Sequence, residues 1–372
     1  MASGFSLKDQ LFNIEKTRYL AGLFAQADSG FDAAGFEKSV MSRLLDLELK
    51  ERIDWIATCL AEKLPDHLPD AAPLLRAALP PPLDPDLKDD DFGDFIFAPL
   101  GEFVVRSGLE HHADLSLDLL EEITQRFSVE WAIRPFLNQW PQKVLSRMEA
   151  WATHDSYHVR RLVSEGTRPR LPWGMSIGLA LEDPLPLLDQ LHSDPTRYVT
   201  RSVANHLNDI TKKDPDLVLA QLAAWRNGGM QDASELDWMT AHALRGLVKA
   251  GHPGAMTLLG YDPEARVEVH LSLSAPNARI GEALNFAAQI NGAKGQKVLV
   301  DYRIHFLRPG GKLSVKTFKL KQAVLGADGL QVEKSHKLKG NATTFTLVPG
   351  GHLLDVMVNG RVRDRVAFEL RA

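Results

Sequence analysis

The residues best suited to chemistry are a carboxylate beside a tryptophan and a cluster of arginines further along the chain. Glu130 precedes Trp131 directly. The cluster places four arginines within eleven residues: Arg160, Arg161, Arg168 and Arg170. Glu165 is the only acid among them, and Trp173 follows. Guanidinium groups suit phosphate oxygens, whereas an ionised carboxylate next to an aromatic ring suits a cationic ligand. The competing interpretations are ordinary surface charge for the arginines, and a helix-capping acid followed by core aromatics for Glu130.

The local sequence around Glu130 predicts the start of a helix. Ser128 is a favourable capping residue, which would place Glu130 in the first turn, where the helix dipole favours an ionised carboxylate. Pro135 is expected to kink this helix or to shift its start, because proline has no backbone N–H to donate.

A repeat positions the arginine cluster. Residues 151–165 align with residues 191–205 at an offset of 40, a period typical of HEAT-like helical repeats. Arg161 and Glu165 are four residues apart and therefore share one helix face. Arg201 and Asn205 occupy the same repeat positions, so stacked repeats would align these side chains as a polar ladder on the solenoid. The alternative is an exposed face of salt bridges.

The chain as a whole is expected to contain two domains. Apolar spacing and capping residues such as Asp214 predict helices over most of the first 260 residues. The acidic, proline-rich stretch Pro80–Gly93 is expected to be a loop. From about residue 263 the pattern alternates, which predicts an immunoglobulin-like β-sandwich. We expect a HEAT-like solenoid over 1–262 and the sandwich over 263–372.

The predicted strands are short apolar runs, and Asn359-Gly360 between two of them predicts a hairpin turn. The runs are Val267–Leu273, Val298–Phe306, Val315–Leu320, Phe345–Val348, Leu353–Val358 and Val366–Leu370.

Charge separates the two parts. Residues 271–372 hold 16 Lys and Arg against 7 Asp and Glu, a net charge of +9, whereas the preceding residues carry −14. A basic module attached to an acidic body is one way to build a polyanion-binding protein.

Other features restrict the class of protein. With Cys59 as the single cysteine, an intrachain disulfide and a cysteine-based zinc site are excluded. No secretory signal or membrane span is evident, which favours the cytoplasm. The motifs of serine hydrolases, P-loop proteins and zinc proteases are missing. A metal hydrolase would rest on the pair His111-His112 followed by Asp114, whose histidines face different ways on a helix.

Three long motifs resemble the AlkC branch of the AlkC/AlkD family, bacterial DNA glycosylases built from HEAT-like repeats. They are Arg126–Leu137, His158–Trp173 and Tyr198–Lys212, and the opening Phe5–Asn13 is similar as well. The likeness covers residues 5 to about 260. The C-terminal part resembles the immunoglobulin-like domain that some AlkC proteins carry.

This resemblance implies excision of cationic N3-alkylated bases, 3-methyladenine and 3-methylcytosine, from duplex DNA without base flipping. Alkylated double-stranded DNA would be the partner, with no cofactor and no metal. By motif position Glu130 and Glu165 would be the catalytic carboxylates. The residues in contact with the lesion would be Trp173, Trp131 and Tyr157. We expect a monomer that is cytoplasmic and associates with the nucleoid when bound to DNA.

The remaining candidate residues would hold DNA. In the helical part these are Arg160, Arg161, Arg168, Arg170, Arg201 and Asn205, with Asp209 completing the polar set. In the sandwich they are the turn and edge residues Lys294, Lys297, Arg308, Lys312, Arg361, Arg363 and Arg365. The alternative function is a non-catalytic HEAT-repeat scaffold that binds damaged DNA or a protein. For the sandwich, the alternative is a role in protein binding or in stabilising the solenoid.

Overall fold

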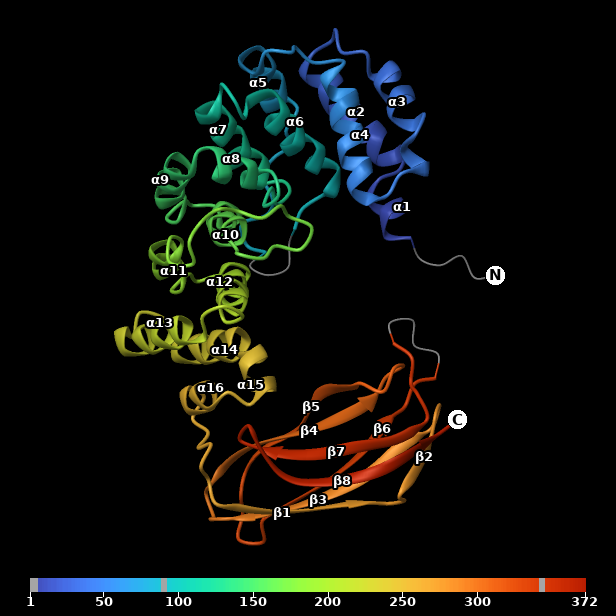
Figure 1. The fold of residues 1–372 in the computed structure, drawn as a ribbon. Helices are drawn as coiled ribbons and strands as arrows, with labels where there is room; N and C mark the ends of the chain where they lie inside the picture. Colours follow the sequence, from blue (N-terminus) through green and yellow to red (C-terminus); the bar gives the residue numbers. More distant parts are fainter. Residues whose placement is uncertain (1–5, 88–91, 341–344) are drawn as a thin grey trace. The chain divides into compact units, whose positions relative to one another are not determined.

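The computed structural model describes residues 6–87, 92–340 and 345–372, in which helices are followed by strands (Figure 1). The chain divides into two compact units. One comprises Met1–Ile210 and Gly228–Met239, and the other comprises Thr211–Asn227 and Thr240–Ala372. The change from helix to strand falls between Leu258 and Val267. The predicted order of a helical part and a β part is therefore confirmed.

The helices before the pocket region are α1 (Leu7–Leu11), α2 (Ile14–Ala27), α3 (Ala33–Met41), α4 (Leu49–Ala61), α5 (Leu68–Ala77), α6 (Ala98–Gly108) and α7 (Ala113–Thr124), with 3₁₀ turns at Leu44–Asp46 and Phe95–Phe97. Those that follow are α8 (Ile133–Gln139), α9 (Pro141–Trp151), α10 (Tyr157–Gly166), α11 (Leu185–Leu191), α12 (Arg197–Ile210), α13 (Pro215–Gly228), α14 (Ala233–Ala243), α15 (Arg245–Ala250) and α16 (Pro253–Leu258).

The repeat detected in the sequence corresponds to α10 and α12, which begin 40 residues apart and pack against each other. Their contact is apolar on one side, where Val159, Leu162 and Val203 are fully buried. Asp214 caps α13 as expected, because its carboxylate accepts the backbone N–H of Leu217 at 2.9 Å.

Residues 80–87 of the acidic stretch Pro80–Gly93 form no helix or strand, as expected, and residues 88–91 lie outside the described residues.

The second unit is built around a sandwich of two sheets. Their strands are β1 (Val267–Leu273), β2 (Asn277–Arg279), β3 (Ala283–Gly292), β4 (Lys297–Leu307), β5 (Leu313–Val324), β6 (Leu330–Lys337), β7 (Gly350–Val358) and β8 (Arg361–Arg371). The order is β1-β3-β6 in one sheet and β2-β8-β7-β4-β5 in the other. Alternate residues of both sheets, such as Phe286 and Ile304, meet in one buried core.

Most of the predicted strands are confirmed, but the one at Phe345–Val348 is wrong. Those residues have no ladder partner, and Leu347 instead buries its side chain in the sandwich core. Alternating apolar residues can therefore dock on a sheet without joining it. The sequence analysis also missed β2, β3 and β6, whose alternation is diluted by alanine, asparagine and lysine.

The last helices of the chain are fastened to the sandwich. Arg303 of β4 donates to the carbonyl oxygens of Lys249 and Ala250 at 3.2 and 3.0 Å, and Thr317 of β5 donates to that of Lys249. These bonds satisfy carbonyls that α15 leaves open at its C-terminal end. They also explain why α15 and α16 group with the strands.

The hairpin turn at Asn359-Gly360 is confirmed, and both residues have positive φ. The Asn359 side chain is fully buried, accepts the Leu299 N–H at 2.8 Å and donates to the Asp262 carbonyl at 2.8 Å. It thus joins β4 to the segment that leads into the sandwich.

Replacing Asn359 separates its role in the positive-φ turn from the role of its side-chain hydrogen bonds. Asn359→Gly keeps the positive φ but leaves buried backbone groups without partners, so we expect a loss of about 1–3 kcal/mol. Asn359→Ala should lose about 1 kcal/mol more, because alanine is strained at positive φ. Urea unfolding measures the free energy of unfolding of both variants. Equal values for Asn359→Gly and Asn359→Ala would show that the positive φ at this position carries no cost.

Candidate active site

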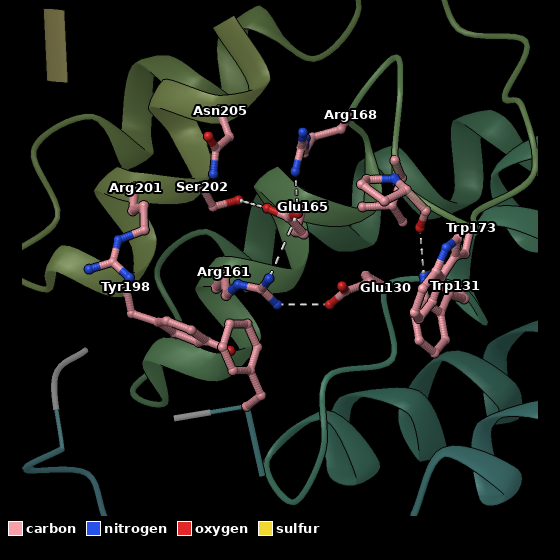
Figure 2. Close-up of a pocket in the computed structure, with 13 residues that line it drawn as sticks. Glu130, Trp131, Arg161, Glu165, Arg168, Trp173, Tyr198, Arg201, Ser202 and Asn205 are labelled. Atoms are coloured by element: carbon pink, nitrogen blue, oxygen red, sulfur yellow. Dashed lines mark hydrogen bonds and ion pairs between the residues drawn. The ribbon is translucent and has the colours of Figure 1, made fainter. Parts of the chain in front are cut away.

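A pocket of about 310 Å³ lies where α10 and α12 meet the segment before α8 and the loop after α10 (Figure 2). It contains two glutamates, three arginines and several aromatic rings. Its lining residues are Phe92, Glu130, Trp131, Arg161, Glu165, Arg168, Leu171, Pro172, Trp173, Tyr198, Arg201, Ser202 and Asn205. The structure therefore brings together both predicted carboxylates and both predicted tryptophans, which come from separate parts of the sequence.

Arg161 is the centre of the charged groups in this pocket. Its side chain is only 7% exposed. One terminal nitrogen donates to Glu130 at 2.8 Å and to the Ser128 hydroxyl at 2.6 Å, and the other lies 3.8 Å from Glu165. Burial by itself lowers the pKa of Arg161, but the two carboxylates raise it above its ordinary value. Arg161 therefore stays charged and holds two acids, while its contact with DNA phosphate stays a prediction.

Glu165 is buried, and described residues occupy both of its carboxylate oxygens. Oε1 accepts a bond from Arg168 at 2.5 Å, and Oε2 accepts one from the Ser202 hydroxyl at 2.6 Å. Burial alone would raise its pKa, but the charges of Arg161 and Arg168 and the bond from Ser202 outweigh it, so the pKa of Glu165 is lowered. Glu165 is therefore an ionised carboxylate with little room for another ligand.

Glu130 is more accessible, with 15% of its side chain exposed against 6% for Glu165. Its Oε2 accepts bonds from Arg161 and from Ser128. Within the part of the chain that the structure describes, no donor bonds to its Oε1. This oxygen is the one available for a molecule in the pocket.

The prediction that Glu130 lies in the first turn of a helix is wrong. The helix α8 begins at Ile133, and Glu130 lies in the turn before it. The start is shifted so that Pro135 falls in the first helical turn, where a missing N–H costs nothing. The Ser128 side chain bonds to Arg161 and Glu130 instead of capping the helix.

Two tryptophans form one wall of the pocket. The rings of Trp131 and Trp173 are 6.1 Å apart, and the Trp131 indole N–H donates to the Pro172 carbonyl at 3.2 Å. Trp173 has a φ of 61° and is 58% exposed. A left-handed backbone is unfavourable for tryptophan and persists only where neighbours hold it.

Buried and surface cations hold the loop that carries Trp173. Arg134 is fully buried and donates to the carbonyl oxygens of Gly166, Arg168 and Met175 at 2.9, 2.9 and 2.6 Å. Lys50 of α4 donates to the Trp173 carbonyl at 2.8 Å. The backbone of the loop that carries the exposed Trp173 is therefore tied to α4 and α8.

Tyr198 and Phe92 line the pocket near Arg161, and the sequence analysis missed both. The Tyr198 ring lies 4.6 Å from the guanidinium carbon of Arg161, and the Phe92 ring lies 5.5 Å from it. Tyr198 was detectable in principle, because it belongs to the repeat alignment one position before Val199. Phe92 follows the acidic loop, where no pattern identified it.

Other predicted residues lie elsewhere or have other partners. Tyr157 does not line the pocket; its hydroxyl donates to the Leu87 carbonyl, which anchors the acidic loop. Arg160 binds Asp194 at 2.5 and 3.2 Å and does not line the pocket. Arg168 bridges Glu165 and Asp209. Arg201 and Asn205 line the pocket, whereas Arg170 is exposed outside its lining.

The candidate residues of the sandwich fall into separate places. Lys294, Lys297, Arg361 and Arg363 lie at the end near β1, where Arg361 pairs with Glu264 and Arg363 donates to the carbonyls of Pro263 and Ala265. Arg308 and Lys312 lie in the turn at the other end of β4, roughly 35 Å away. Arg365 pairs with the buried Asp355. The structure does not gather this set into one patch.

Within the described ranges no helix is long and apolar enough to cross a membrane.

Comparisons with known proteins match both parts of the chain. The family model for the C-terminal Ig-like domain of the uncharacterised protein YhaZ matches residues 268–372, which confirms the immunoglobulin-like class of the sandwich. The uncharacterised protein YhaZ of Bacillus subtilis is 34% identical over 329 residues, 87% of this chain and 88% of its own length.

A solved structure is similar over the whole chain. It is the Pseudomonas fluorescens alkylpurine DNA glycosylase AlkC bound to DNA containing an abasic site analog, with 34% identity and a TM-score of 0.86, covering 99% of this chain and all of that one. The fold places the chain in the class of proteins that join a helical part to an immunoglobulin-like domain, and its pocket lies in the helical part. The chain belongs to the AlkC family.

A buried histidine between α10 and α12 leads us to expect that the stability of the protein depends on pH. His206 of α12 is fully buried, and its Nδ1 lies 3.0 Å from the Ser164 carbonyl of α10. Burial lowers its pKa to about 4 from an ordinary value of 6.5. The unfolded chain therefore binds a proton that the folded chain refuses between pH 6.5 and 4, so this contribution to stability is lost as the pH falls through that window.

We expect the free energy of unfolding to fall by about 2 kcal/mol from this residue between pH 7 and pH 5. His206→Asn retains a donor for Ser164 but does not titrate. Although the variant should be less stable throughout, its change between the two pH values should be smaller by that amount in urea unfolding. An identical change in both proteins would show that His206 does not cause it.

Proposed function

We propose that this protein is a DNA glycosylase that hydrolyses the N-glycosidic bond of cationic N3-alkylated bases, such as 3-methyladenine and 3-methylcytosine, in duplex DNA. The observation that carries the proposal is the placement of two carboxylates around one buried arginine, opposite two tryptophans, in a single pocket. Membership of the AlkC family, which includes an alkylpurine DNA glycosylase, supports it.

The chemistry of these lesions fits the pocket. Alkylation at N3 makes the base positively charged and hence a good leaving group, so departure requires no general acid. The sugar develops an oxocarbenium-like positive charge, as in glycoside hydrolysis. A carboxylate that is already ionised, as Glu165 is, stabilises this charge without rearranging. Trp131 and Trp173 can add a cation–π contact with the base, worth about 0.5–2 kcal/mol.

The two carboxylates have different roles in this proposal. Glu130 has an oxygen that no described residue binds, so it is the one that positions and deprotonates the attacking water. Glu165 uses both oxygens to hold Arg168 and Ser202 and acts through its charge. Arg161 keeps both in place. The base is proposed to remain in the stack, because Trp173, which would contact it, is exposed at the edge of the pocket.

Phosphates flanking the lesion would be held by Arg170, which is exposed next to the lining residue Leu171, and by Arg201, which lines the pocket. We further propose that the helical residues 1–262 carry the catalytic site, that residues 263–372 form the basic domain that adds DNA affinity, and that one chain acts as a monomer. Binding to alkylated DNA without any base release would instead favour the non-catalytic scaffold.

Separate replacements test the two carboxylate roles. Glu130→Gln should lower the single-turnover rate of 3-methyladenine release by roughly 10²–10⁴-fold with DNA affinity preserved, and it should also lower stability, because buried Arg161 loses one of its two carboxylates. Glu165→Gln should also lose activity and destabilise the fold by about 3–5 kcal/mol, because it leaves two buried arginines short of a negative charge. Glu149→Gln, at an exposed site on α9, is the control. Wild-type rates in Glu130→Gln would contradict the assignment.

A comparison of cationic and neutral bases as substrates tests the proposed function as a whole. In the presence of EDTA, the protein should release 3-methyladenine or 3-methylcytosine from methylated duplex DNA and leave uracil in place. A neutral base gains little from carboxylates and tryptophans, so its barrier stays high. Base release can be followed by chromatography of the free bases. Robust release of uracil, or a requirement for a metal, would refute this mechanism.

A further inference from the structure

The loop after α10 makes a tight turn at residues 171–174, and Trp173 occupies the third position of this turn. The backbone N–H of Gly174 donates to the Leu171 carbonyl at 3.2 Å, which closes the four residues into a turn. Pro172 stands in the second position, and Trp173 follows it with a φ of 61°. Proline second and a positive φ third define a type II turn. The third position normally belongs to glycine or asparagine, because other side chains crowd the backbone there.

Tryptophan in this position requires support from outside the turn. A type I turn would give the same four residues a negative φ at Trp173 and no strain. The ring of Trp173 is 58% exposed, so its burial contributes little toward holding the strained form. Contacts from other parts of the chain must therefore favour type II over type I.

The first such contact comes from the indole N–H of Trp131. Types I and II differ in the direction of the peptide between Pro172 and Trp173, because the ψ angle before it changes by about 150°. The carbonyl oxygen of this peptide accepts the N–H of Trp131 at 3.2 Å. In a type I turn the same oxygen would point away from Trp131 and the bond would be lost. This hydrogen bond therefore favours the type II form.

The second contact comes from α4, which is distant in the sequence. Nζ of Lys50 donates to the carbonyl oxygen of Trp173 at 2.8 Å, across 123 positions of the chain. A bond from a charged donor is stronger than one between neutral groups. Lys50 and Trp131 thus hold the carbonyls of the two peptides that flank Trp173. Because both peptides are held, so is the direction in which the Trp173 side chain leaves the backbone.

The two tryptophans differ in their access to a molecule in the pocket. Their ring centroids are 6.1 Å apart and the ring planes are tilted by 40° (Figure 2). A flat base stacked between two rings needs them roughly 7 Å apart and parallel, twice the carbon–carbon contact distance of about 3.5 Å. The pair is therefore not a slot for a base. Trp173 is the exposed ring, and the half-buried Trp131 lies beside it as a support.

We propose that Lys50 and the indole N–H of Trp131 are positioning residues, which hold the turn at 171–174 in the type II form and thereby direct the ring of Trp173 at the cationic base. This inference rests on the proposed function. It adds Lys50, which lies outside the three motifs of the sequence, and it gives Trp131 a role through its N–H. The competing explanation is that Lys50 binds a DNA phosphate and that Trp131 acts only through the face of its ring.

The test is the single-turnover rate of 3-methyladenine release by the full chain at saturating enzyme. Lys50→Met and Trp131→Phe, which keeps an aromatic ring but has no N–H, should each lower this rate by roughly 2–30-fold, the range that one cation–π contact supplies. The control Lys38→Met removes an exposed lysine from α3 and should release base at the wild-type rate. In a Trp173→Ala background, Lys50→Met and Trp131→Phe should cause no further loss, because the ring that they position is gone.

Three results would overturn the inference. The first is unchanged release by Lys50→Met and Trp131→Phe. The second is a full additional loss from either substitution in the Trp173→Ala background. The third is a loss of affinity and of salt dependence for undamaged duplex in Lys50→Met, because Lys50 would then bind phosphate.

Fluorine NMR of the chain labelled with fluorotryptophan separates this inference from the proposed function. The signal of Trp173, identified by its loss in Trp173→Phe, should shift in Lys50→Met and stay in place in Lys38→Met, with no DNA present. If the signal shifts but the wild-type chain releases no base, the proposed function fails while the positioning of Trp173 stands. If release is normal and the signal does not move, only the positioning role is refuted.

Discussion

The site depends on the burial of one guanidinium group between two carboxylates. A charge removed from water is tolerated only when it is paired and hydrogen-bonded. Arg161 meets this condition through Glu130, Glu165 and Ser128. The charges of Arg161 and Arg168 lower the pKa of Glu165 and keep it ionised beside the aromatic rings of the pocket. Arg161 thereby orients two carboxylates and balances their charge within the pocket.

Two parts of the fold surround these charged groups: the packed helices α10 and α12, and the loop that follows α10. Helices α10 and α12 pack so that Ser202 reaches Glu165, while Arg168 joins the same carboxylate to Asp209. Arg134 ties down the loop that follows α10, and this fixes the exposed Trp173. The buried arginines Arg134 and Arg161 therefore hold backbone carbonyls and acids of this fold in place.

The sequence predicted the features that depend on local patterns. The 40-residue repeat identified α10 and α12, the alternation of Val267–Leu273 matched β1, and Asn359-Gly360 marked a hairpin. The resemblance in three motifs identified the glutamates and tryptophans that the pocket brings together. The sequence could not predict which basic side chain pairs with which acidic one. Arg160 and Arg161 are adjacent and identical in type, yet one binds Asp194 and the other the pocket acids, because neighbouring residues on a helix face different directions. Tyr198 and Phe92 depend on tertiary packing in the same way.

The most direct test of this account is the pH dependence of single-turnover 3-methyladenine release by Arg161→Met, with Arg161→Lys as the charged control. If Arg161 holds Glu165 ionised, its removal raises the pKa of Glu165, so the acid limb of the rate profile moves to higher pH while the salt dependence of DNA binding stays the same. The lysine variant should lie between it and the wild type. An unmoved acid limb together with a reduced salt slope would show that Arg161 binds phosphate, and it would contradict the account.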